Sequence, residues 1–128
     1  MPKKPKGASA EYQLILSRKK GENASSFVFT LRTVKEFRSF QYLISVDTEV
    51  GEKQIRFDIK GLQTPGIALP RSGPATYTRE FADLKGQYEV IVKNTGGEEN
   101  RFLISLRGDS VSVKETPMRK FVQFVAEL

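Results

Sequence analysis

Apolar and polar residues alternate along most of this chain, and this alternation constrains the fold more than any other feature. The clearest segment runs from Gln54 to Lys60, where Ile55, Phe57 and Ile59 alternate with polar or charged residues. Successive side chains of a strand point to opposite faces, so the pattern predicts a strand with one buried and one solvated face. No window of helical length carries a sustained i, i+3, i+4, i+7 apolar stripe, and we expect little or no helix.

The same alternation recurs along the rest of the chain. It predicts strands at Tyr12 to Leu16, Phe27 to Leu31, Phe40 to Val46, Tyr88 to Val92 and Phe102 to Leu106, and weaker strands at Tyr77 to Phe81, Val111 to Val113 and Phe121 to Val125. We therefore expect an all-β fold, an antiparallel β-sandwich of about eight to nine strands, immunoglobulin-like or jelly-roll-like. A closed antiparallel β-barrel is the alternative, because connection through consecutive hairpins permits both.

Three of the expected hairpins share one sequence pattern, a Tyr at the strand start and a Gly-Glu pair nine residues later. The pattern comprises Tyr12, Gly21 and Glu22, then Tyr42, Gly51 and Glu52, then Tyr88, Gly97 and Glu98. The Tyr supplies a large anchor, and the Gly supplies the positive-φ residue that a hairpin loop demands. Hairpins of equal length select similar turn residues, so the pattern does not require a duplication.

One segment carries a resemblance to known folds. The run Leu84, Gly86, Tyr88, Val90 and Val92 resembles a strand start of fibronectin type III and immunoglobulin-like sandwiches, where a Tyr hydrogen-bonds back over the preceding corner. The chain lacks the Trp and the Cys pair of such domains. The resemblance implies a sandwich and no activity, because a fold does not fix a function.

The chain of 128 residues fits one domain, residues 11–128, behind a basic tail of residues 1–10 that we expect to be disordered. The net charge is +6, and the first 20 residues contribute +5 of it. Six cations there are candidate phosphate contacts: Lys3, Lys4, Lys6, Arg18, Lys19 and Lys20. Basicity therefore belongs to the tail and the first turn rather than to the body of the domain.

The absence of Cys and His restricts the chemistry. It removes disulfides, thiolate and imidazole metal sites and the commonest general base. No calcium loop, S-x-x-K, G-x-S-x-G or G-x-x-x-x-G-K-[ST] motif is present, so we predict no catalytic, metal or cofactor site and no enzyme. No apolar run approaches the ~20 residues of a membrane span, and no secretory signal is visible, so we expect a cytoplasmic protein.

Two features indicate a partner. The stretch Gly61 to Ala75 is the candidate binding loop, with Pro65, Gly66, Pro70, Arg71 and Pro74 as its candidate contacts. Five apolar residues lie on nominally polar faces near mid-strand and form a candidate interaction patch if their strands are neighbours: Ile15, Val28, Leu43, Ile91 and Leu103. Another subunit, or the apolar segment Phe121 to Leu128, would cover such a patch. The structural alternatives are a proline-stiffened crossover and isolated surface residues.

Two short motifs are interpreted as turns. Arg107, Gly108 and Asp109 spell an adhesion tripeptide, but Gly-Asp between two strand patterns predicts a tight hairpin. Asn23, Ala24 and Ser25 spell a glycosylation sequon at an expected loop.

We predict a non-enzymatic protein-interaction or structural module that binds another protein, or its own copy, through a sheet face, a sheet edge or the candidate binding loop. The first alternative is a weakly specific nucleic-acid binder that uses the basic tail and first turn. The second alternative is a carrier of a small apolar ligand, which requires a barrel.

Overall fold

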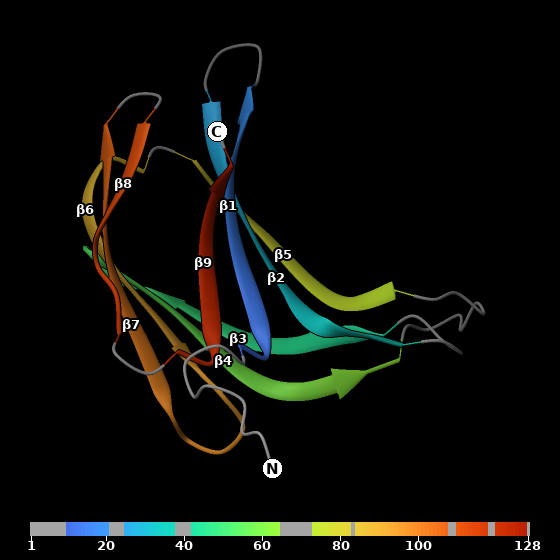
Figure 1. The fold of residues 1–128 in the computed structure, drawn as a ribbon. Coiled ribbons are helices and arrows are strands. Elements are labelled where there is room, and N and C mark those ends of the chain that lie inside the picture. Colours follow the sequence, from blue (N-terminus) through green and yellow to red (C-terminus); the bar gives the residue numbers. More distant parts are fainter. Residues whose placement is uncertain are drawn as a thin grey trace, which may run out of the picture.

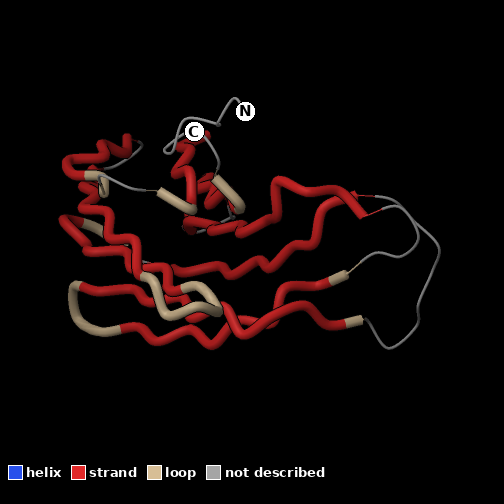
Figure 2. Tube along the Cα trace, turned by 60° about the horizontal axis from the view of Figure 1, so that its bottom comes forward, coloured by secondary structure: helices blue, strands red, loops and turns tan. Residues whose placement is uncertain are grey.

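The computed structural model describes residues 10–20, 25–37, 42–64, 73–82, 84–107, 110–117 and 120–127. These residues form nine strands and no helix (Figures 1 and 2): β1 (Tyr12–Lys20), β2 (Ser25–Phe37), β3 (Leu43–Val50), β4 (Gln54–Gln63), β5 (Gly73–Ala82), β6 (Gly86–Lys93), β7 (Glu99–Arg107), β8 (Ser110–Glu115) and β9 (Val122–Glu127). The prediction of an all-β fold is confirmed. Within the described part, no helix is long and apolar enough to cross a bilayer.

All nine strands belong to one sheet, in the order β8-β7-β6-β4-β3-β5-β2-β1-β9. We predicted an antiparallel sandwich, but the sheet is mixed, because β1 pairs with β9, β3 with β5 and β4 with β6 in parallel. These parallel pairs connect the hairpins sideways into a single curved sheet that nearly closes on itself (Figure 1). The structure therefore fits the barrel alternative rather than two separate sheets.

The sheet has its shortest strand pairing at its centre, where β3 meets β5. Only one residue pair, Leu43 and Thr76, joins these two strands in register. Beyond it the strands diverge, and the Thr48 hydroxyl meets the Tyr77 hydroxyl at 2.6 Å across the opening. Two halves, β8-β7-β6-β4-β3 and β5-β2-β1-β9, thus face each other across a common core.

The three hairpins predicted from the shared pattern are present as β1–β2, β3–β4 and β6–β7, and β7–β8 closes with Arg107 opposite Ser110. The predicted positive φ holds for Gly97, at 92°, but not for Gly51. In the β3–β4 turn the Gly51 amide donates to the Gln54 carbonyl at 2.7 Å with ordinary backbone geometry, so the turn does not need glycine for its φ. Gly21 lies outside the described residues.

One apolar core fills the space inside the curved sheet. The alternation of β4 points Ile55, Phe57 and Ile59 into it, and all three are buried. The Phe29 ring of β2 lies 5.5 Å from the Phe57 ring of β4, measured between centroids, so an aromatic contact joins the two halves. Phe29 also lies 5.6 Å from Phe81 of its own half. Every buried side-chain nitrogen or oxygen of the described residues has a hydrogen-bond partner.

Candidate functional site

The barrel is incomplete at one seam, between β8 and β9. These strands are consecutive in the chain and are connected by the short segment 116–121, an arrangement that commonly gives a hairpin. They nevertheless stand at opposite ends of the strand order and do not pair (Figure 1). Contacts other than pairing with β8 therefore hold β9 in place at this seam, and one side of β8 is left without a partner strand.

Asn100 of β7 fastens the start of β9. Its side-chain Oδ1 accepts hydrogen bonds from the backbone amides of Phe121, at 2.9 Å, and Val122, at 3.2 Å. The Phe121 carbonyl in turn accepts from the amides of Glu11 and Tyr12 at 2.8 and 3.0 Å. Asn100 is only 3 % exposed, so these are buried bonds. A side chain thus takes the place of a strand ladder where the barrel closes.

An aromatic contact reinforces this closure. The rings of Phe102 in β7 and Phe124 in β9 lie 5.3 Å apart between centroids. Phe121 and Val122 are buried in the core, so the apolar C-terminal segment joins the barrel as a strand beside β1. Since β9 is held through side chains of β7, it does not need β8.

The consequence is an open edge on β8, which we call the β8 edge: the side of Ser110–Glu115 that faces away from β7. No strand of the described residues pairs with it. Val111 packs partly against the core, whereas Val113 is 39 % exposed. The register shifts between Val113 and Glu115, so Lys114 has no residue directly opposite it on β7. Unsatisfied backbone donors and acceptors on such an edge can pair with another chain.

A second feature is an apolar groove of about 570 Å³ at the end of the barrel where β2 and β4 finish. We call it the barrel-mouth groove. Its apolar lining comes from five residues: Ala10, Tyr12, Val34, Phe37 and Leu62. Val34 is 53 % exposed and Leu62 46 %, which makes them two of the most exposed large apolar side chains of the described residues.

Val34 is exposed because it continues the alternation of β2, in which Leu31 and Thr33 face the core and Val34 faces outward. Beside it, the pairing of β2 with β5 is interrupted by a β-bulge between Arg32 and Glu36. The Thr33 hydroxyl repairs the ladder by accepting from the Ala75 amide at 2.9 Å and donating to the Lys35 carbonyl at 2.8 Å. In the same groove, burial of the hydroxyl and, to a smaller extent, the nearby Glu11 carboxylate raise the pKa of Tyr12.

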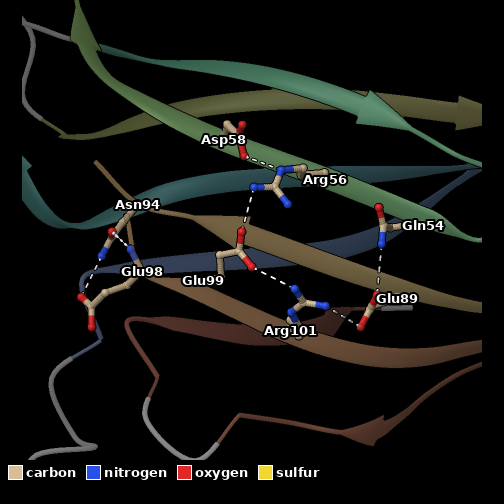
Figure 3. Close-up of polar contacts among 8 residues, drawn as sticks. All are labelled: Gln54, Arg56, Asp58, Glu89, Asn94, Glu98, Glu99 and Arg101. Atoms are coloured by element: carbon tan, nitrogen blue, oxygen red, sulfur yellow. Dashed lines mark hydrogen bonds and ion pairs between the residues drawn. The ribbon is translucent and has the colours of Figure 1, made fainter. Parts of the chain in front are cut away.

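A third feature is a network of charged side chains on the outer face of β4, β6 and β7 (Figure 3). Arg56 donates to Asp58 at 2.9 Å and to Glu99 at 2.8 Å. Arg101 donates to Glu99 at 3.0 Å and to Glu89 at 3.4 Å. Glu99 therefore links two arginines from β4 and β7, the strands on either side of β6.

This network covers Ile91, which we predicted to belong to an exposed apolar patch. Ile91 lies opposite Arg56 of β4 on one side and Arg101 of β7 on the other. Ile91 is only 1 % exposed. Because the long stems of arginine shield apolar surface, this part of the sheet face needs no external partner.

The network predicts a contribution of Glu99 to the pH dependence of stability. Hydrogen bonds from Arg56, and then from Arg101, lower the pKa of Glu99 from its ordinary value. A carboxyl group whose pKa is lower in the folded than in the unfolded state stabilises the fold at any pH above its unfolded-state pKa. This stabilisation is lost as the pH falls through the folded-state pKa. We expect Glu99→Gln to flatten the acid limb of the stability curve below pH about 4.5 in urea titrations. An unchanged acid limb would contradict this role.

The other residues of the candidate interaction patch are half-buried. Ile15 and Val28 lie on the neighbouring strands β1 and β2, and Val125 of β9 lies opposite Ile15. Leu103 is on β7 beside β6, whereas Leu43 is on β3. The strand order therefore places the five residues in three separate parts of the sheet rather than bringing them into one patch.

The candidate binding loop is only partly described. Pro65, Gly66, Pro70 and Arg71 lie outside the described residues, and Pro74 belongs to β5, opposite Glu36. Both ends of the predicted loop, from Gly61 and up to Ala75, are strand residues. Of these residues, Leu62 lines the barrel-mouth groove.

The candidate phosphate contacts are also divided. Lys3, Lys4 and Lys6 lie outside the described residues. Arg18, Lys19 and Lys20 lie at the end of β1. The Lys19 ammonium is 3.6 Å from a carboxylate oxygen of Glu80, which partly offsets its charge. Comparisons with protein-family models, with curated proteins and with solved structures gave no match to this chain.

Proposed function

We propose that this domain is a non-enzymatic protein-interaction module that binds an extended segment of a partner protein by strand addition at the β8 edge. The observation that carries the proposal is that the β8 edge has no partner strand among the described residues, while β9, at the other end of the sheet, is fastened by Asn100 and Phe102. In strand addition, main-chain hydrogen bonds provide affinity and alternate side chains provide specificity.

The composition of β8 supports this role. Proteins usually protect an exposed edge with charges, proline or a bulge. From Ser110 to Val113 the strand carries no charge and no proline. Charges and the irregular register begin only at Lys114 and Glu115. Four consecutive residues are therefore open to a regular ladder.

The partner segment has a defined pattern. Val111 and Val113 lie opposite Leu106 and Ile104, whose side chains face the core. The partner residues beside the two valines should therefore be apolar, and those beside Ser110 and Ser112 polar, because opposite residues share a face. An alternating segment of about five residues matches this edge.

The test is a selection of random twelve-residue peptides displayed on phage against the immobilised full chain. We expect enriched peptides with alternating apolar residues, whose binding perturbs NMR resonances of β8. Val113→Lys should weaken their binding at least tenfold because it places a charge where the partner is apolar. Val50→Lys is the matched control, since Val50 is also an exposed valine in a strand: it is 50 % exposed and lies at the end of β3.

Two proline variants test whether binding uses the backbone amides of the β8 edge. Amides of successive strand residues point to opposite edges, so of Ser112→Pro and Val113→Pro one removes an edge-facing amide and the other a bond to β7. The variant that keeps native circular dichroism should lose peptide binding. Peptides that bind this variant and Val113→Lys as well as they bind the native chain, or a selection without enrichment, contradict the proposal.

The barrel-mouth groove supports a second candidate function, the binding of a small apolar ligand. Its volume of about 570 Å³ lies within the range of small-molecule pockets. This candidate differs from the first in its sensitivity to mutation: Leu62→Lys should abolish the binding of an apolar fluorescent dye, whereas Val113→Lys should leave it unchanged.

A further inference from the structure

We propose that the partner of the β8 edge is a second copy of this chain, paired antiparallel through β8 about a two-fold axis at Ser112. This inference rests on the proposed function and names its partner. Two identical edges related by a two-fold axis always run antiparallel, so β8 can pair with itself without any change of fold.

Side-chain matching fixes the register. With Ser112 opposite its own copy, Val111 lies opposite Val113 of the second copy, and Ser110 lies opposite Lys114. This is the register in which both valines of each strand meet a valine on the core-facing side and serine meets serine on the outer side. A two-residue shift toward the C-terminus would place Val111 opposite Glu115. The apolar match therefore selects one alignment.

Charges permit the same alignment. No like-charged side chains of β8 stand opposite each other when Ser112 is on the axis, because Lys114 faces Ser110. The two chains each carry +6, so their overall repulsion opposes association and added salt should strengthen it by screening. Nucleic-acid binding has the opposite salt dependence, because counterion release weakens with added salt.

The size of the contact sets the expected strength. In this alignment five residues of each β8, Ser110 to Lys114, face each other. This is a smaller interface than that of a standard protein complex, so the dimer should depend on concentration rather than be permanent. Light scattering of the full chain should show a mass rising from 14.4 kDa toward twice that value as concentration increases to about 1 mM, and rising earlier in high salt. Val113→Lys should remain monomeric, and Val50→Lys should associate like the native chain.

A cross-link tests the register itself. The chain contains no Cys, so a single Ser112→Cys variant has only its own copy to react with. Opposite residues of an antiparallel pair have Cα atoms about 4.5–5.5 Å apart, within the span of a disulfide. The matched control is Ser110→Cys, whose copies would lie about 13 Å apart along the strands. Under a mild oxidant, the Ser112→Cys dimer should form at least tenfold faster, and a reducing agent should reverse it.

Cross-linking, solution mass and peptide binding together decide whether β8 pairs with its own copy. Equal cross-linking rates for the two variants, no cross-link for Ser112→Cys, or a constant monomer mass at every concentration and salt would overturn self-pairing. If the mass stays monomeric while selected peptides bind the β8 edge and lose binding in Val113→Lys, the proposed function stands and only the identity of the partner fails. If peptides fail as well, both proposals fail.

Discussion

Asn100→Ala is expected to lower the free energy of unfolding by about 2–4 kcal/mol, because it leaves two buried backbone amides without an acceptor. These are the amides of Phe121 and Val122, which bond to the Asn100 Oδ1. Urea unfolding measures the loss. Hydrogen exchange should show it locally, with the amides at the start of β9 exchanging faster than those of β2 and β5.

The chain contains a matched control for this prediction. Asn94 also accepts two backbone amides through its Oδ1, those of Gly96 and Glu98, at 3.0 and 2.9 Å. These bonds lie in the exposed turn between β6 and β7, where water can replace the lost acceptor. Asn94→Ala should therefore reduce stability by less than about 1 kcal/mol. Equal losses for the two alanine variants would show that Asn100 is not a special closure of the barrel.

Phe57→Ala is expected to reduce stability by about 3–5 kcal/mol, since it opens a cavity at the meeting point of the two halves. Phe57 is fully buried and contacts the rings of Phe29 and Tyr77, with centroids 5.5 and 6.4 Å apart. The surrounding strands are fixed by the ladder on both sides and can close the space only in part. Thermal and urea unfolding measure the effect.

Val50→Ala is the control for Phe57→Ala, because Val50 is half exposed and its truncation makes no internal cavity. Its effect should stay within about 0.5 kcal/mol. A loss below about 1 kcal/mol for Phe57→Ala would mean that the core relaxes around the missing ring and that the two halves do not depend on it.

The strands were accessible to prediction because burial imposes a period of two on each of them separately. β4 is the clearest case, where Ile55, Phe57 and Ile59 all enter the core as predicted. The pairing of distant strands leaves no such local trace. The parallel contacts of β9 with β1 and of β4 with β6 depend on how the whole sheet curves, so hairpin signals alone favoured an antiparallel sandwich.

The candidate site was harder to predict for a related reason. Whether Ile91 is exposed depends on Arg56 and Arg101 of the neighbouring strands, which the local pattern of β6 does not contain. Asn100 did leave a signal: it occupies a core-facing position of β7, two residues before Phe102, where an apolar residue is normal. A polar side chain at such a position indicates that it makes hydrogen bonds in the interior. Which backbone it serves follows only from the fold.

β8 keeps an open edge because β9 closes onto β7 without it. Amide hydrogen exchange along β8, measured by NMR on the dilute monomer, reports whether this edge is open. We expect alternation, with the amides bonded to β7 protected and the amides between them exchanging as fast as exposed backbone. Uniform protection from Ser110 to Val113 in the monomer would mean that the edge is covered within the chain and that β8 has no open edge for a partner.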